Sequence, residues 1–255
     1  MEKSKLVFWI FSLLFVLDIF LYIYQPLGEN FYIIGDLFVI FLSFLAFSSG
    51  LYAYTLHGSK SLVGKAFLFL SLGVFFWFLG ETIWGIYEIV LGIKAPVASI
   101  ADVFWILGYP CFLLGLVYIL KITRFPIRKS KIILLIFLFS FIFSSLIYLA
   151  IPTITNPEIS IEEKLSTAGY VIGDIFLLSC ITFATVNLFG TKTFRSYFLI
   201  ILGLVCMTMA DIYYMNFLEI YKVGNLIDLL WDLGYILLCL GFFYYRKTMK
   251  ALLKK

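Results

Sequence analysis

The sequence predicts an all-helical integral membrane protein with eight transmembrane helices, and its composition and hydropathy pattern carry this prediction. Of the 255 residues 63% are hydrophobic and only 13% are charged, whereas soluble domains are about 45–50% apolar and about 25% charged. The mean hydropathy is +1.07 and the net charge is +4. These values exclude an ordinary soluble domain, a disulfide scaffold and a nucleic-acid-binding protein. The bilayer is therefore the expected surroundings of most of the chain.

Eight apolar segments are long enough to cross a hydrocarbon layer of about 30 Å, which requires roughly 20 mainly apolar residues per helix. They cover residues 6–25, 31–55, 65–91, 98–120, 131–151, 166–189, 196–220 and 225–245. Short segments that contain glycine, proline and charged residues separate them, as turns between helices should. Because these segments account for nearly the whole chain, we expect one membrane domain and no soluble domain.

The distribution of basic residues predicts the orientation of the helices. Sixteen of the nineteen lysines and arginines fall in the termini and loops that share one side of the membrane. The opposite side has Lys94, Lys164 and Lys222, together with an acidic loop over residues 152–164. Cytoplasmic loops carry the excess of Lys and Arg. We therefore expect a multi-pass protein of the cell membrane with both termini cytoplasmic, whose first span is a signal anchor and is not cleaved.

The two halves of the chain resemble each other. Residues 32–38 match residues 170–176 at five of seven positions, and residues 102–109 match 228–235 at five of eight. Between these matches, Gly80-Glu81 aligns with Ala210-Asp211, and Trp84 aligns with Tyr214. An even number of spans in each half gives both halves the same direction through the bilayer. We predict two parallel four-helix repeats, over residues 1–125 and 126–255.

Acidic residues are unusually frequent within the spans. Ten of the fifteen lie in or at the edge of an apolar segment, namely Asp18, Asp36, Glu81, Glu88, Asp102, Asp174, Asp211, Glu219, Asp228 and Asp232. A carboxylate at the bilayer centre costs roughly 2.5–3.5 kcal/mol on insertion scales, and such residues usually mark function. Nearly all of them belong to the outer half of the membrane, where no intramembrane Lys or Arg accompanies them. They must be protonated, hydrogen-bonded to Tyr and Trp, hydrated, or neutralised by a bound cation.

Aromatic residues accompany these acids at helical spacing. Asp102, Trp105 and Tyr109 lie at i, i+3 and i+7 and share one face of a helix. The second half repeats the stripe, and the third span has one of its own. This pattern predicts an outward-facing acidic and aromatic cavity that binds a ligand. The expected ligand-binding residues are Asp36, Glu81, Trp84, Glu88, Asp102, Trp105, Tyr109, Asp174, Asp211, Tyr214, Asp228, Trp231, Asp232 and Tyr235.

Structural roles compete with this interpretation for some of these acids. Asp102 follows Ser99 and Asp228 follows Asn225 at helix starts, where a carboxylate can cap the helix. Glu81 lies mid-helix, as does its counterpart Asp211, and capping cannot explain either. We expect Glu81 to approach Asp102, and Asp211 to approach Asp228, at similar depths on consecutive antiparallel spans.

The sequence has no catalytic motif. The four cysteines lie within apolar spans without a C-x-x-C pair, and the one histidine cannot build a haem or zinc site. No Ser-His pair, metal cluster or nucleotide motif accompanies the acids. We therefore expect no catalytic residues and no cofactor other than a bound cation or lipid. An intramembrane hydrolase that uses paired carboxylates as acid and base is the least favoured alternative.

The segment Ser99 to Pro110 (SIADVFWILGYP) resembles part of the multi-span sensor regions that precede diguanylate cyclase, PAS or histidine kinase modules in signalling proteins. Only about ten residues follow Tyr245, so an output domain is not expected. The resemblance implies a stand-alone sensor that signals through a separate cytoplasmic protein. A proton- or cation-coupled transporter or channel is the main alternative. The crowding of the acids on one side, without a polar relay in the cytoplasmic half, disfavours it.

The predicted orientation can be tested by labelling single cysteines in intact cells, with the native cysteines replaced. A membrane-impermeant maleimide should label a cysteine at position 158 and should fail to label one at position 250 until the membrane is permeabilised. The reverse pattern would overturn both the orientation and the outward placement of the acids.

Overall fold

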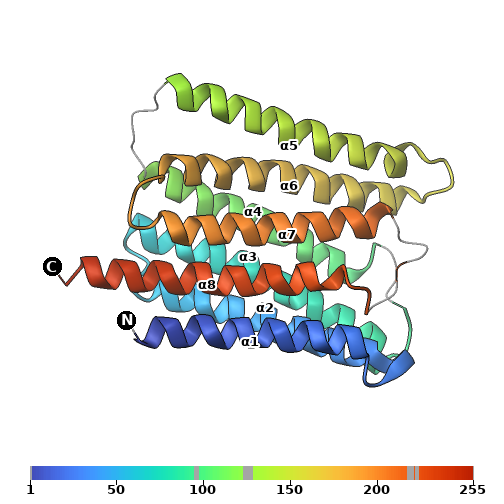
Figure 1. Cartoon of the computed structure of the whole chain (residues 1–255). Helices are drawn as coiled ribbons and strands as arrows, with labels where there is room; N and C mark the ends of the chain where they lie inside the picture. The colour runs from blue at the N-terminus through green and yellow to red at the C-terminus, as the bar shows by residue number, and fades with distance from the viewer. Residues whose placement is uncertain (1, 95–97, 123–128, 217–220, 222–223, 255) are drawn as a thin grey trace.

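The computed structural model is a bundle of eight long helices that lie side by side (Figure 1). It describes residues 2–94, 98–122, 129–216, 221 and 224–254, and the side chains within these ranges except those of 2–4 and 129–131. The helices are α1 (Glu2–Tyr24), α2 (Tyr32–Tyr54), α3 (Leu62–Gly85), α4 (Ile100–Ile122), α5 (Lys129–Thr155), α6 (Ile161–Asn187), α7 (Phe194–Asn216) and α8 (Asp228–Leu252). A 3-10 turn, η1 (Gly28–Phe31), precedes α2, and a π-helical turn, η2 (Ile86–Val90), continues α3.

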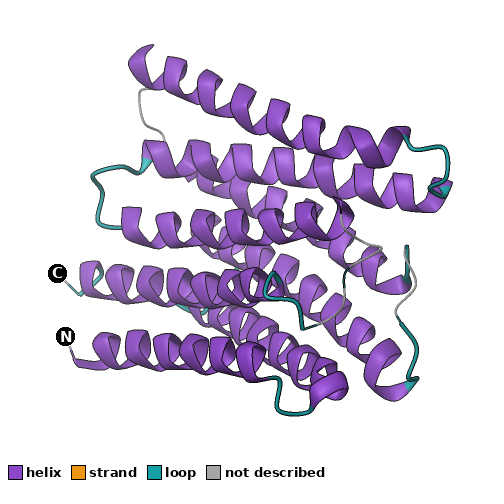
Figure 2. Ribbon diagram, turned by 45° about the vertical axis from the view of Figure 1, so that its right-hand side comes forward, coloured by secondary structure: helices purple, strands orange, loops and turns teal. Residues whose placement is uncertain are grey.

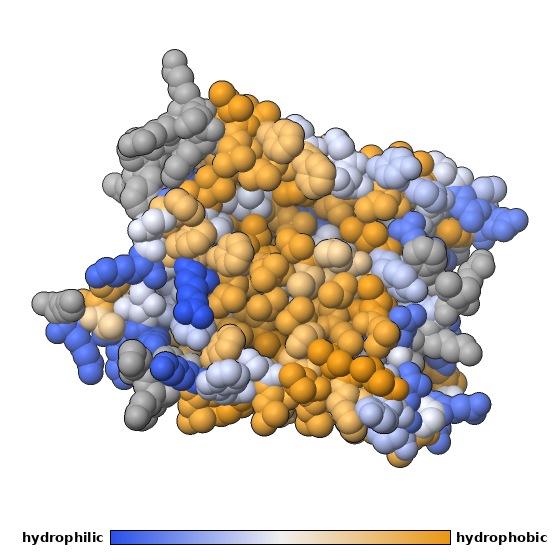
Figure 3. Space-filling view, in the orientation of Figure 1, coloured by the Kyte–Doolittle hydropathy of each residue, from blue (hydrophilic) through white to orange (hydrophobic). Residues whose placement is uncertain are grey.

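All eight helices are long and apolar enough to cross a membrane. The described residues contain no strand (Figure 2). An orange apolar band covers the middle of the visible face, and hydrophilic residues gather at its two ends (Figure 3). The prediction of an all-helical, multi-span membrane protein is confirmed.

The helix ends differ from the predicted ones where capping residues extend a helix beyond its apolar stretch. The sixth helix begins at Ile161, not at 166, because the hydroxyl of Ser160 accepts a hydrogen bond from the Glu163 N–H (3.2 Å). The charged residues of this first turn lower its hydropathy, although acids at a helix start are favourable. At the other end of the chain, α8 continues to Leu252 and not only to 245.

The eight helices are not equally enclosed. About two thirds of the most apolar window of α8 is buried, against about a tenth in α1 and still less in α5. Figure 1 shows α1 and α5 at opposite edges of the bundle. Within the bundle, α2 packs on α3 and α8, and α6 packs on α4, α5 and α7. The face of α5 carries exposed Phe137, Phe141 and Tyr148, as a helix in contact with lipid should.

Glycines let α3 and α4 approach each other closely. A Cβ added to Gly108 would lie 2.6 Å from the Trp77 ring and 3.1 Å from the Gly73 carbonyl oxygen, and one added to Gly73 would lie 2.8 Å from Phe112. The Trp77 indole N–H also donates to the Trp105 carbonyl (3.1 Å). Small residues that permit such contacts are a common device of membrane helices, where hydrophobicity alone does not bring helices together.

Both chain termini lie at the same end of the bundle (Figure 1). At this end Arg246 of α8 donates to the Tyr52 carbonyl and to the Thr55 hydroxyl (2.8 Å), and its guanidinium lies 3.8 Å from the Tyr52 ring centre. The Tyr52 carbonyl also accepts a hydrogen bond from the Thr55 hydroxyl (2.9 Å). Arg246 therefore adds a second donor at the end of α2, where the last carbonyls lack helical partners. Partial burial, and then the charge of Arg246, lower the pKa of His57 beside it.

The close packing of α3 on α4 predicts that Gly108→Ala destabilises the protein by about 1–3 kcal/mol, because the added methyl group meets a backbone carbonyl and a buried indole. Gly169→Ala is the matched control. Its methyl group would meet only the end of Ile106 at 3.1 Å, and the higher helix propensity of alanine offsets this. Unfolding in detergent measures both, and equal effects would contradict the packing described.

Candidate functional site

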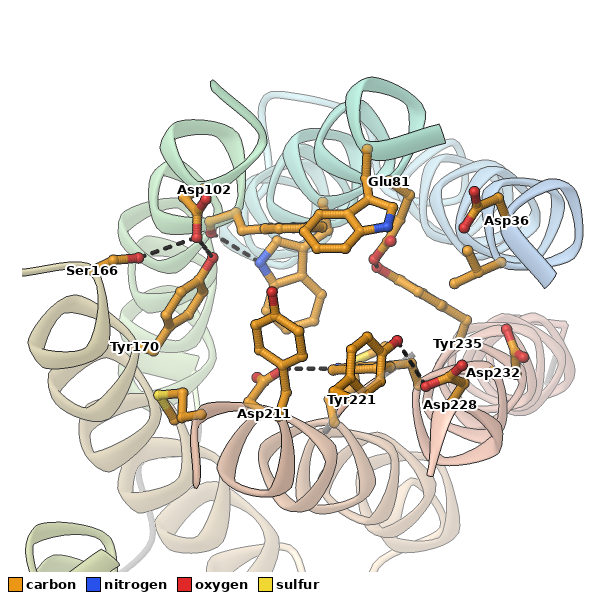
Figure 4. A pocket seen from close by; sticks show the side chains of 18 of the residues that line it. Asp36, Glu81, Asp102, Ser166, Tyr170, Asp211, Tyr221, Asp228, Asp232 and Tyr235 are labelled. Atoms are coloured by element: carbon orange, nitrogen blue, oxygen red, sulfur yellow. Dashed lines mark hydrogen bonds between the residues drawn. The ribbon is translucent and has the colours of Figure 1, made fainter. Parts of the chain in front are cut away.

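A cavity of about 130 Å³ lies at the end of the bundle opposite the termini (Figure 4). Its walls come from the last turns of α3 and α7 and the first turns of α4, α6 and α8, with α2 and Tyr22 of α1 completing them. Twelve of the predicted ligand-binding residues line it, namely Asp36, Glu81, Trp84, Asp102, Trp105, Tyr109, Asp211, Tyr214, Asp228, Trp231, Asp232 and Tyr235.

Two predicted residues are placed elsewhere. Asp174 is buried within α6 and is held by Tyr109, away from the cavity wall. Glu88 lies on the π-helical turn η2, half-buried, and is not among the residues that line the cavity. A third intramembrane acid, Glu219, lies outside the described residues.

Two carboxylates of the cavity accept hydrogen bonds from aromatic side chains of α8. The Tyr235 hydroxyl of α8 donates to Glu81 of α3 (2.7 Å). The Trp231 indole N–H, one turn earlier on α8, donates to Asp211 of α7 (2.7 Å). A hydrogen bond to a charged group contributes about 1.5–3 kcal/mol. One face of α8 therefore supplies the donors for acids on both neighbouring walls.

A second pair of bonds joins α4 to α6. The Tyr170 hydroxyl donates to Asp102 (2.8 Å), and the Tyr109 hydroxyl donates to Asp174 (2.8 Å). Tyr170 and Asp174 are neighbours on one helix, yet each bonds to α4 and not to the other. Helical spacing predicts that Tyr170 and Asp174 share one face of α6. The packing of α4 on α6 determines which tyrosine donates to which acid.

Asp102 also stabilises the start of its own helix. Its second oxygen accepts from the Ser99 N–H (2.7 Å) and hydroxyl (3.1 Å), while that hydroxyl accepts from the Ala101 N–H (3.1 Å). This reciprocal arrangement is a capping box. Ser166 of α6 adds a further donor to Asp102 (3.1 Å). The capping role considered for this residue is present together with the contacts to α6.

Asp228 has the corresponding role at the start of α8. Its carboxylate accepts from the Gly224 N–H (2.8 Å) and from the Tyr221 hydroxyl (2.9 Å). Burial, and then the charge of Asp228, raise the pKa of Tyr221 well above its usual value, so that this phenol stays neutral and donates. Asp228 therefore holds Tyr221 and Gly224 in place before α8 and at the same time lines the cavity.

The sequence predicts that Glu81 approaches Asp102 and that Asp211 approaches Asp228. The members of each pair line the same cavity, but no hydrogen bond among these four described residues joins them directly. All four residues line the cavity, and each carboxylate has its own hydrogen-bond donor. Figure 4 shows Glu81, Asp102, Asp211 and Asp228 spaced around the cavity with aromatic rings between them. The like charges are thus separated by aromatic side chains.

Aromatic rings form a continuous series along the mouth of the cavity. Trp84 lies 5.7 Å from Trp105 and 6.0 Å from Tyr214, measured between ring centres. Tyr214 in turn lies 6.2 Å from Trp231 and 4.9 Å from Tyr221. The negative faces of such rings attract cations, most strongly where water is excluded.

Several residues that line the cavity were not predicted from the sequence, because little in the sequence around them indicates a site. Ser166 lies one turn before Tyr170 on α6, and Tyr221 lies in a loop without any helical period. Tyr22 could have been found because it lies one turn after Asp18 on α1. Among the described residues, no group of three or more His, Cys, Asp or Glu side chains is arranged to hold a metal ion.

No protein-family model, curated protein or solved structure matches this chain. The resemblance of the segment Ser99 to Pro110 to sensor regions therefore stays a prediction. Its residues have definite places in the structure, since Asp102, Trp105 and Tyr109 line the cavity.

The hydrogen bonds between helices predict that Tyr235→Phe lowers the free energy of unfolding by about 1.5–3 kcal/mol, because the Glu81 carboxyl loses the hydrogen bond from α8 and keeps that from Trp105. Tyr148→Phe is the matched control, since Tyr148 is 74% exposed on the outer face of α5. Reversible unfolding in mixed detergent micelles gives both values. If Tyr235→Phe behaves like the control, Tyr235 does not hold Glu81.

Proposed function

We propose that this protein is a sensory or ligand-binding membrane module that takes a small organic cation into the outward-facing cavity. The observation that carries the proposal is the lining itself, in which carboxylates alternate with Trp and Tyr rings and no described lysine or arginine is present. Negative charge and aromatic faces are the two features that recognise substituted ammonium ions. Concave sites with a few convergent polar groups are the usual ligand sites of proteins.

The size of the cavity narrows the class of ligand. An apolar cavity of about 150 Å³ accommodates benzene, and the cavity here measures about 130 Å³. A tertiary or quaternary ammonium group with small substituents fits this volume, while a lipid tail or a large drug-like molecule exceeds it. The carboxylates of Glu81 and Asp211 are the expected counter-charges, because they line the cavity and do not cap a helix.

The orientation follows from the charge distribution. Both termini are cytoplasmic on the positive-inside rule, and the cavity lies at the end of the bundle opposite to them (Figure 1). The ligand would therefore enter from outside the cell. A separate signalling protein on the cytoplasmic face is the partner that the resemblance to sensor regions implies.

Helix packing supports the proposed repeats over residues 1–125 and 126–255. The second helix of each half packs on the fourth helix of the other half, α2 on α8 and α6 on α4. Trp84 and Tyr214, which align in the two halves, meet each other with ring centres 6.0 Å apart. A cavity between two such halves could change shape when the halves move relative to each other.

Transport of a proton or cation is less well supported than binding. Towards the termini the core is closed by large side chains, among them the fully buried Phe67 and Phe242, whose ring centres lie 6.0 Å apart. Phe67 also packs against Tyr245, at 4.1 Å. Among the described residues of this apolar region, no chain of acids continues the path from the cavity to the cytoplasmic side.

The proposal predicts saturable binding of tetramethylammonium, measured by intrinsic fluorescence in detergent. Trp77, Trp84, Trp105 and Trp231 line the cavity, so four of the five tryptophans report directly on it. The cation should change the emission, and the neutral tert-butanol, of similar shape, should have little effect. Glu81→Gln and Asp211→Asn should each weaken binding about tenfold, equivalent to about 1.4 kcal/mol.

Glu162→Gln is the control for the loss of a charge, since Glu162 is exposed at the start of α6. It should bind as the wild type does. Equal responses to the cation and to tert-butanol, or unchanged binding in both cavity variants, would contradict the proposal. Native mass spectrometry of gently purified protein would identify a natural ligand, and it should show a retained small cation that is lost in Glu81→Gln.

A further inference from the structure

We infer that Asp18 of α1 and Asp232 of α8 bind one shared proton, and that this proton holds α1 against the rest of the bundle. The site is distinct from the proposed ligand contacts at Glu81 and Asp211. The inference does not depend on the proposed function.

The geometry of the two carboxyl groups requires a hydrogen atom between them. Both residues are completely buried, at 0% exposure. Their carboxyl groups lie within hydrogen-bonding reach of each other. None of their four oxygens accepts a hydrogen bond from any other described group. Two carboxylates are both acceptors only, so they can bond only if one of them is protonated.

The charged and phenolic groups around the pair favour this state. From the helices packed around it, Asp228 of α8, Glu81 of α3 and Asp36 of α2 add negative charge, and Tyr22 of α1 adds a neutral phenol. No positive group among the described residues faces the pair. Two adjacent ionised carboxylates would thus be buried without compensation, which is strongly unfavourable.

The first helix depends on few contacts. Among the helices that the structure describes, α8 alone packs closely on α1, and most of the surface of α1 faces outward. The described side chains of α1 that are fully buried are Asp18 and Tyr22. Together with Gln25 they form one stripe at i, i+4 and i+7, in which Tyr22 packs on Phe31 (5.0 Å) and Gln25 donates to the Gly224 carbonyl (3.0 Å).

Polar contacts of this kind hold membrane helices together, because apolar packing between helices differs little from packing against lipid. The shared proton at Asp18 is the deepest contact of the stripe. Its stabilising contribution is present at low pH, where the proton is bound, and is lost as the pH rises and both carboxyl groups ionise. Since Asp232 and Tyr22 also line the cavity, release of α1 would open one cavity wall.

Replacing one acid by its amide tests the inference, because the amide N–H₂ of Asp18→Asn donates to the Asp232 carboxylate at any pH. Thermal unfolding in detergent should be followed from about pH 5 to about pH 9. The midpoint of the wild type should fall with pH by about 5 °C more than that of Asp18→Asn or of Asp232→Asn. Glu162→Gln, which replaces an exposed acid, should follow the wild type.

Infrared spectroscopy gives a second readout that does not depend on stability. The wild type should show a protonated carboxyl band near neutral pH that is lost in Asp18→Asn. Parallel pH profiles of the wild type and both variants, or no such band, would overturn the inference. Protection of the wild type alone by added Na⁺ at alkaline pH would also overturn it, since a metal cation and not a proton would then join the two carboxyl groups.

Discussion

A carboxyl group inside a bilayer must have a hydrogen-bond donor or lose its charge, and in this protein aromatic side chains supply many of these donors from another helix. Tyr235 donates a hydrogen bond to Glu81, Trp231 donates one to Asp211, and Tyr170 donates one to Asp102. Each of these bonds joins two different helices, so the hydrogen bonds to the acids also link the helices around the cavity. A tyrosine or tryptophan brings a large apolar body into lipid-like surroundings together with one donor, and it does so without the charge of a lysine or arginine.

Neutral Tyr and Trp donors stabilise the carboxylates without cancelling their negative charge. The cavity is therefore suited to bind a cation. Tyr235 donates to one oxygen of Glu81 and Trp231 donates to one oxygen of Asp211. The rings of Trp84 and Tyr214 line the same cavity. A small cation that enters would compete with the donors for these oxygens and would gain contacts with the rings. Under the proposed function, the bonds from α8 to α3 and α7 are therefore the contacts that a ligand would loosen, and a movement of α8 would carry the change to the cytoplasmic end.

Hydropathy and length were sufficient to predict the eight helices, and helical spacing grouped acids and aromatic residues of which twelve line one cavity. The start of α6 was missed because Glu162 and Glu163 lower the hydropathy of a turn that Ser160 caps. The partner of each acid could not be predicted, since Tyr109 and Asp174 are 65 residues apart and meet only through the packing of α4 on α6. The contact between Asp18 and Asp232 could not be predicted from the sequence, because the two residues lie on the first and the last helix.

The central claim is that aromatic donors bind the membrane carboxyl groups and thereby join the helices, and a double-mutant cycle between Glu81 and Tyr235 tests it most directly. Glu81→Leu, Tyr235→Phe and the double variant would be unfolded reversibly in mixed detergent micelles. The account predicts a coupling free energy of at least about 1 kcal/mol, as expected for two groups in contact. Additive effects of the two substitutions, within about 0.3 kcal/mol, would contradict it.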